Sequence, residues 1–231
     1  MIDTHLAVVR RASKHLEPVV LIVNNDDSTR AWIEAVVVST GLRAISVSEA
    51  SALAACVESD APACAILDVG LPDGSGLDLQ EPLACAGVSI LFLAREPSVS
   101  ACARAFKAGA VDFLTLPCDP AEFVRALQNA IHEALSLWTR RTRSNELRSR
   151  YERLTARERE VFSLVSSGLL NKQVAERLNI SEITVQIHRG RVMRKMAARS
   201  IVSLVRMADA LLPASRPLEI PMASPHPGAA G

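Results

Sequence analysis

The first 120 residues alternate short apolar runs with stretches of helical spacing, and this alternation most constrains the fold. The runs are VVLIV (19–23), RAISV (43–47), CAILDV (64–69), SILFLA (89–94) and DFLTL (112–116). Segments such as TRAWIEAVVVSTG and SVSACARAFKAGA separate them, with apolar residues at helical spacing. Strands that are apolar on both faces indicate a parallel sheet covered by helices on each side. We therefore expect an α/β domain with a five-stranded, doubly wound parallel sheet.

Charge divides the chain into two parts of different character. Residues 1–120 carry 8 basic and 15 acidic side chains, whereas residues 121–231 carry 18 basic and 10 acidic ones. The 231 residues are 49% apolar and 22% charged, which is typical of globular protein and is enough for two domains. An acidic part joined to a basic part favours a module that meets a polyanion such as DNA.

Several classes of protein and site are disfavoured by the sequence. No apolar run approaches the roughly 18 residues that cross a bilayer, and the opening MIDTHLAVVRRASKHLEP lacks a signal-like apolar core, so we expect a cytoplasmic protein with no membrane partner. The cysteines are odd in number and widely spaced, which predicts neither a disulfide framework nor a zinc site, and no metal centre is expected from them. They are Cys56, Cys64, Cys85, Cys102 and Cys118.

Polar residues follow three of the predicted strands, at the edge where function gathers in a parallel sheet. NNDD follows the first strand, Asp68 with GLPDGSGLDL ends the third, and LPC follows the fifth. With FKAGAVDFLTLP, residues 18–120 resemble the receiver domain of bacterial response regulators, which implies a flavodoxin-like fold. In that family a histidine kinase phosphorylates the third-strand Asp, and two acids after the first strand help to bind Mg²⁺. A Ser or Thr after the fourth strand and a Lys before a Pro read the phosphate.

Asp68 matches the phosphoacceptor of that family, but the other positions do not match. The acidic pair falls on Asn24 and Asn25, the hydroxyl on Ala94, and the lysine on Leu116, before Pro117. Amides are poor replacements for carboxylates around Mg²⁺, and neither Ala nor Leu can bond a phosphoryl group. The resemblance therefore predicts an atypical receiver with a degenerate site, which serves as a dimerisation or docking module.

Alternatives remain at this site. If the first strand ran two residues longer, Asp26 and Asp27 would form the acidic pair. Asp27 and Ser28 are otherwise expected to cap the next helix. Asp26 together with Asp68 could hold Mg²⁺ weakly, although no cofactor is predicted. Phosphorylation at Asp68 by a cognate histidine kinase is thus the alternative hypothesis.

Residues 121–152 are predicted to extend the last receiver helix into a linker. Apolar residues keep helical spacing through its first half, and an Arg-rich stretch precedes a second set. These residues are Val124, Leu127, Ile131, Leu135 and Trp138, then Leu147, Tyr151 and Leu154. The first set fits packing on the helix's own sheet, whereas the stripe could also pair with its copy in a dimer.

The region from residue 153 to residue 212 has helix-turn-helix character. It predicts a helix stopped at Gly168, a second helix ending at Asn179, and a third capped by Ser181. The stretch RLTAREREVFSLVSSGLLNKQVAERLNISEITVQIHRGRVMRKM resembles the LuxR-type DNA-binding domain, most closely its FixJ-like branch, over residues 153–211.

The third helix is predicted to present a cationic surface to the major groove of double-stranded DNA. Its inner face is expected at Ile183, Val185, Val192 and Met196. By resemblance Gln186 and Ile187 read bases, Lys172 holds a phosphate, and Gly190 lets the backbone approach. The full predicted DNA-binding set is Lys172, Ser181, Thr184, Gln186, Ile187, His188, Arg189, Gly190, Arg191, Arg194 and Lys195.

A fourth helix, Arg199 to Leu212, carries Ile201, Leu204, Val205 and Ala208 on one side, and the resemblance assigns the homodimer to it. Residues 1–17 form an N-terminal extension, and the Pro-rich tail 213–231 is expected to be disordered. We expect a dimeric, sequence-specific transcriptional regulator and not an enzyme. RNA polymerase or another regulator is a further candidate partner.

Overall fold

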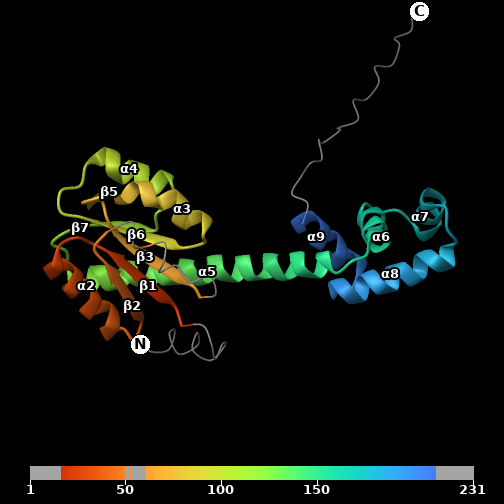
Figure 1. Ribbon diagram of the computed structural model, residues 1–231, viewed down its shortest axis with the longest axis horizontal. Coiled ribbons are helices and arrows are strands. Elements are labelled where there is room, and N and C mark those ends of the chain that lie inside the picture. Colours follow the sequence, from red (N-terminus) through yellow and green to blue (C-terminus); the bar gives the residue numbers. More distant parts are fainter. Residues whose placement is uncertain (1–16, 50–52, 54–60, 212–231) are drawn as a thin grey trace, which may run out of the picture. The chain divides into compact units, whose positions relative to one another are not determined.

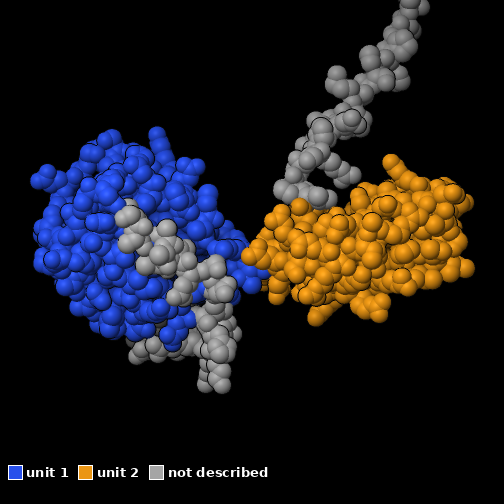
Figure 2. Space-filling model, viewed as in Figure 1, with its two compact units in different colours: residues 1–142 blue, residues 143–231 orange. Residues whose placement is uncertain are grey.

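The computed structural model describes residues 17–49, 53 and 61–211 (Figure 1). The chain divides into two compact units, residues 1–142 and residues 143–231, which are coloured separately in Figure 2. Most of the predicted N-terminal extension, the predicted disordered tail and Cys56 lie outside the described residues.

A parallel sheet forms the centre of the first unit. Among the described residues its strands lie in the order β2-β1-β3-β6-β7. Their bounds are β1 (Val19–Val23), β2 (Arg43–Val47), β3 (Ala63–Asp68), β6 (Ser89–Ala94) and β7 (Asp112–Thr115). All five predicted strands are confirmed, and their ends differ from the expected ones by at most one residue. After β2 the chain crosses to the other side of β1, where β3, β6 and β7 are added in turn. The carboxyl ends of the neighbouring strands β1, β3 and β6 therefore lie side by side.

Helices cover both faces of the sheet (Figure 1). On one face α2 (Asp27–Ser39) and the first part of α5 (Pro120–Glu152) bury apolar residues against β1, β3 and β6. On the other face lie α3 (Gln80–Cys85) and α4 (Val99–Lys107), with a second core between them and the sheet. After β3 the chain forms the short pair β4 (Gly70–Leu71) and β5 (Gly74–Ser75), followed by the 3-10 turn η2 (Gly76–Leu79). These layers are the predicted doubly wound arrangement.

Helix α5 runs without interruption for 33 residues, as the prediction of an extended last helix requires. Its first half buries Phe123, Leu127 and Ile131 in the core of the sheet. Near its end, Leu147 and Tyr151 pack against the core of the second unit instead. The apolar residues in the first half of α5 therefore pack in the core of the first unit, and those near its end pack in the core of the second unit.

The second unit consists of helices around one small core. They are α6 (Ala156–Ser166), α7 (Asn171–Leu178), α8 (Glu182–Met196) and α9 (Ile201–Leu211). Gly168, with φ of +92°, follows α6, and Asn179 ends α7 in the left-handed conformation at φ of 51°. Ser181 caps α8 by accepting a hydrogen bond from the Thr184 amide. The three predicted end signals of the helix-turn-helix are thus confirmed.

One predicted core position of α8 is wrong. Val185, Val192 and Met196 are buried, but the side chain of Ile183 is 71% exposed. Two residues along a helix are separated by about 200° of rotation, so Ile183 and Val185 cannot share a face. Ile183 instead lies at the exposed start of the helix.

Candidate functional sites at the sheet edge and on the helix-turn-helix

Four polar side chains form the sheet-edge site: Asn24 and Asp26 after β1, Asp68 at the end of β3, and Arg95 after β6. Because β1 ends at Val23, the asparagines follow the strand directly, and the rival register with Asp26 and Asp27 as the pair is wrong. Asn24 is 1% exposed, and both ends of its amide are bonded. Its Nδ2 donates to Asp68 Oδ2 at 2.9 Å, and its Oδ1 accepts from the Asp26 amide at 2.9 Å. The second amide, Asn25, is exposed.

Asp68 is partly buried beside these groups. Its Oδ1 accepts a hydrogen bond from the Gly70 amide at 3.0 Å. Burial raises the pKa of its carboxyl group, while the Gly70 N–H and the charge of Arg95 oppose that rise in pKa. A Cβ on Gly76 would lie 2.0 Å from the carbonyl oxygen of Asp68, so the turn after β3 requires glycine at this position.

Asp26 is the N-cap of α2, whereas the sequence predicted Asp27 and Ser28 for this role. Its Oδ1 accepts from the Thr29 amide and from Ser28 Oγ, both at 2.7 Å. These bonds hold the pKa of Asp26 far below its ordinary value. One oxygen of the carboxylate that could have held Mg²⁺ is therefore already bonded to the start of a helix. Among the described residues no three His, Cys, Asp or Glu side chains form a group suited to a metal ion.

Arg95 is the member of the site that sequence reasoning missed. Its Nη2 lies 2.9 Å from Asp26 Oδ1 and donates to Thr29 Oγ1 at 2.8 Å. The available signal was a basic residue directly after the fourth strand, at the same sheet edge as NNDD. Ala94 before it is buried, and Leu116 packs against the core ahead of a cis peptide bond to Pro117. A cation thus lies at this edge, but not at the lysine position of the family pattern.

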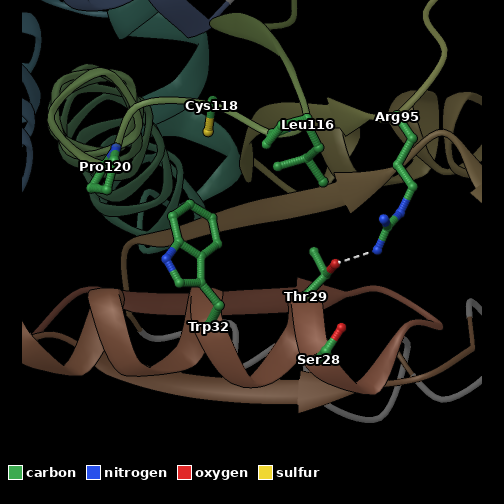
Figure 3. Close-up of a pocket in the computed structure, with 8 residues that line it drawn as sticks. Ser28, Thr29, Trp32, Arg95, Leu116, Cys118 and Pro120 are labelled. Atoms are coloured by element: carbon green, nitrogen blue, oxygen red, sulfur yellow. Dashed lines mark hydrogen bonds between the residues drawn. The ribbon is translucent and has the colours of Figure 1, made fainter.

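A pocket of about 450 Å³ opens between the start of α2, the end of β6 and the loop after β7. Figure 3 shows the Trp32 ring rising from α2 toward Cys118 and Leu116, with Arg95 at the other end. The pocket is lined by Ser28, Thr29, Trp32, Arg95, Leu116, Pro117, Cys118 and Pro120.

On the second unit, α8 presents most of the predicted DNA-binding residues at its surface. Gln186, Ile187, Gly190, Arg191 and Arg194 are exposed. Lys172 of α7 is exposed as well, whereas Thr184 and His188 are half-buried. The exposed residues form a basic surface, and the two candidates for reading bases, Gln186 and Ile187, lie near the N-terminal end of α8.

Arg189 and Ser181 also have structural contacts within the second unit. Arg189 Nη1 donates to Asn171 Oδ1 at 2.8 Å and so ties α8 to the start of α7. Ser181 is occupied as the N-cap of α8.

Lys195, another predicted DNA contact, is bound inside its own unit. Its Nζ lies 2.6 Å from Glu158 Oε2 and 3.1 Å from the carbonyl oxygen of Arg153. Glu158 also accepts from the Thr155 amide, which completes a capping box at the start of α6. Burial alone would raise the pKa of Glu158, but the bonds from Lys195 and Thr155 outweigh burial and lower this pKa. The charge of Lys195 is therefore compensated before any phosphate approaches.

The predicted dimer face of α9 is only partly available. Leu204 and Ala208 are buried in the core of their own unit, and Ile201 packs against that core. A second chain cannot contact the buried pair without opening the unit. Val205 is half-buried, and Val202, which sequence reasoning did not select, is 63% exposed.

Comparisons with known proteins agree with this architecture. Residues 20–128 match the family described as response regulator receiver domain, and residues 152–208 match bacterial regulatory proteins of the luxR family. The chain is 38% identical to response regulator protein TmoT of Ectopseudomonas mendocina over 84% of this chain and 90% of that protein. It is 37% identical to transcriptional regulatory protein FixJ of Rhizobium meliloti over 62% of this chain and 71% of that protein.

The folds agree as well. The low-resolution structure of response regulator StyR matches with a TM-score of 0.72 and 31% identity, covering 84% of this chain and 98% of StyR. Full-length FixJ from B. japonicum matches with a TM-score of 0.50 and 26% identity, over 85% of this chain and 98% of that one. Within the described residues we find no helix with the length and hydropathy needed to span a bilayer. With a receiver fold followed by a luxR-type helix-turn-helix, the chain belongs to the FixJ-type response regulators, which bind DNA.

Proposed function

We propose that the protein is a dimeric, sequence-specific transcriptional regulator whose receiver is not switched by ordinary Mg²⁺-dependent phosphorylation of Asp68. The bond from Asn24 to Asp68 carries the proposal. A metal-binding pair at this edge would offer acceptor oxygens to a cation, but the Asn24 amide turns its N–H toward Asp68 and its oxygen toward the Asp26 amide. The side chain next to Asp68 thus acts as a donor in place of a metal ligand.

The remaining groups support the same conclusion. Ala94 has no hydroxyl and Leu116 no ammonium group, so neither can distinguish a phosphorylated from an unmodified Asp68. A modification shifts a conformational equilibrium only if it interacts differently with the two states. Phosphate at Asp68 would consequently have little effect on the rest of the receiver.

The alternative is a phosphorylation-activated regulator, for which a histidine kinase is the partner that a receiver domain implies. Arg95 favours this reading, because its charge already acts on the Asp68 carboxyl group and it could accept part of a phosphoryl charge. Its ion pair with Asp26 weighs against that role, since phosphate would have to compete with a carboxylate 2.9 Å away.

The test compares wild type with Asp68→Asn on an operator found by footprinting. We expect operator affinities within about threefold of each other, under roughly 1 kcal/mol, with or without acetyl phosphate and Mg²⁺. Asp78→Asn is the control, because Asp78 lies in an exposed ion pair with Arg104 in the same unit. A stoichiometric, acid-stable mass increase that disappears in Asp68→Asn would show that Asp68 accepts phosphate. A more than tenfold loss of affinity with the circular dichroism unchanged would establish a working switch.

For DNA, we propose that α8 enters the major groove, with Gln186 and Ile187 reading bases while Lys172, Arg191 and Arg194 contact phosphates. Their exposure on one helix and the adjoining start of α7 supports these roles. The groove is wide enough for a helix, and Gln can make paired bonds to adenine. Such a regulator acts where the chromosome lies, so we place it in the cytoplasm, with RNA polymerase as a candidate partner.

For the dimer, we propose that α9 contributes Val202 and Val205. They lie three residues apart on the helix, and Val202 has most of its side chain exposed. Val202→Glu should shift the chain toward monomer in sedimentation velocity if this surface forms the interface. An unchanged sedimentation profile would assign the dimer, if one forms, to another surface.

A further inference from the structure

We infer that the pocket beside the sheet-edge site binds a small aromatic acid. The pocket measures about 450 Å³ and is formed by α2 together with the segments that follow β6 and β7. Ligand sites in proteins are commonly clefts of roughly 300 to 1,000 Å³ with apolar walls and a few polar groups that fix orientation. The inference does not depend on whether Asp68 accepts phosphate, and its test uses a different readout.

One end of the pocket suits an aromatic ring. Trp32 packs against Phe123 with ring centroids 5.1 Å apart and an interplanar angle of 56°, which holds the indole in place. Leu116 and Cys118 are also half-buried against the same core, and all three side chains line the pocket. In Figure 3 the Trp32 ring reaches toward these two residues from the opposite wall. A flat apolar group placed there would contact an indole face and the leucine side chain.

The other end suits an anionic oxygen. Within the described residues Arg95 contacts Asp26 and Thr29, and both contacts use Nη2. The N–H groups of Nη1 thus remain available for an acceptor, and a guanidinium group binds a planar carboxylate well.

The two ends together define the chemical class. A ring without an acid would fill the apolar end but would offer no acceptor to the Nη1 N–H groups of Arg95. An amine would add a second cation beside Arg95. An aromatic carboxylate satisfies both ends, which is why we assign this class rather than a neutral or basic ring.

The experiment follows the two indole N–H resonances of the full-length, ¹⁵N-labelled chain, which has only Trp32 and Trp138. Trp138→Phe assigns the signals. Benzoate is titrated, and benzyl alcohol and benzylamine serve as matched rings with a neutral and a cationic group. We expect a saturable shift of the Trp32 resonance with benzoate, an unmoved Trp138 resonance, and at least tenfold weaker binding of benzylamine.

Two variants test the polar contact. Arg95→Ala should weaken benzoate at least fivefold and bring it level with benzyl alcohol. Arg104→Ala is the matched control, because Arg104 also forms an exposed ion pair in this unit, with Asp78 at 2.6 Å, but does not line the pocket. Its binding of benzoate should equal that of wild type. The proposal is overturned if benzoate gives no saturable Trp32 shift, if benzylamine binds equally well, or if both arginine variants behave alike.

Discussion

Replacing Lys195 with methionine removes the cation that faces Glu158 in the helix-turn-helix unit. The carboxylate of Glu158 is only 3% exposed and would retain the Thr155 amide as its described bonding partner. Methionine preserves most of the apolar stem of lysine, so the change acts mainly on charge. The expected result is a less stable DNA-binding unit with an unchanged fold.

The magnitude follows from the burial of the two partners. Breaking a fully buried ion pair costs about 3–5 kcal/mol, and a charge-assisted hydrogen bond contributes about 1.5–3 kcal/mol. Because the Lys195 side chain is 35% exposed, we place the cost of Lys195→Met at about 2–3 kcal/mol of unfolding free energy. Glu158→Gln keeps an acceptor for the Thr155 amide and should cost about 1–1.5 kcal/mol. The double variant should recover about 1–2 kcal/mol relative to the sum of the two single changes.

The assay uses the single tyrosine of the chain. Tyr151 packs on Phe162 in the core of this unit, with ring centroids 5.3 Å apart. Labelling it with 3-fluorotyrosine gives one ¹⁹F signal that reports unfolding of this unit in urea, separately from the receiver. Additive losses in the double variant would refute the argument, because independent residues show no coupling free energy.

The same pair predicts a pH dependence. The folded-state pKa of Glu158 is lowered, so its contribution to stability is fully present above its unfolded pKa of about 4.3. That contribution is lost as the pH falls through the lower folded-state value. The difference in unfolding free energy between wild type and Glu158→Gln should stay constant from about pH 7 to 5 and shrink at more acidic pH. A difference that instead grew on acidification would contradict the assigned direction.

Further substitutions test other parts of the chain. Gln186→Ala should reduce discrimination between operator and random duplex by about 1–3 kcal/mol, whereas Lys172→Ala should weaken both alike and lower the salt slope by about 1 in fluorescence anisotropy titrations. Equal losses on both duplexes for Gln186→Ala would refute base reading. Leu204→Ala should cost about 2–5 kcal/mol in the ¹⁹F urea assay, because this side chain is fully buried. Gly76→Ala should lower the melting temperature of the receiver, because the added Cβ would clash with the carbonyl oxygen of Asp68. Gly70→Ala, with open space around its Cβ position, serves as the control. Equal melting temperatures for the two variants would contradict the predicted clash.

Periodicity and end signals were enough to predict the architecture. The strands are continuous apolar runs, and α7 ends at Asn179, whose left-handed conformation stops the helix. The position of Asn24 also followed from the sequence, because a buried amide in the middle of a Val and Ile strand would be costly. Local rules work where the deciding interaction lies within a few residues.

The contacts that long side chains make between distant parts of the sequence were not predicted. Arg95 reaches Asp26 across 69 positions of sequence, and Lys195 reaches Glu158 across 37. Helical spacing placed Lys195 beside the outer face of α8, but it could not show that Glu158 of α6 lies within reach of this side chain. The same limit applied to α9, where apolar spacing grouped Leu204 with the predicted dimer face although this side chain is buried in the core of its own unit.

The hydrogen bond from Asn24 to Asp68 limits which substitutions residue 24 tolerates. Asn24→Asp would replace a donor by an acceptor 2.9 Å from another carboxylate, in a position only 1% exposed. Such a step is unfavourable by itself, because two like charges at that distance repel strongly unless a cation is supplied. A carboxylate at residue 24 would therefore need a cation beside it, whereas the neutral Asn24 amide holds Asp68 in place without one.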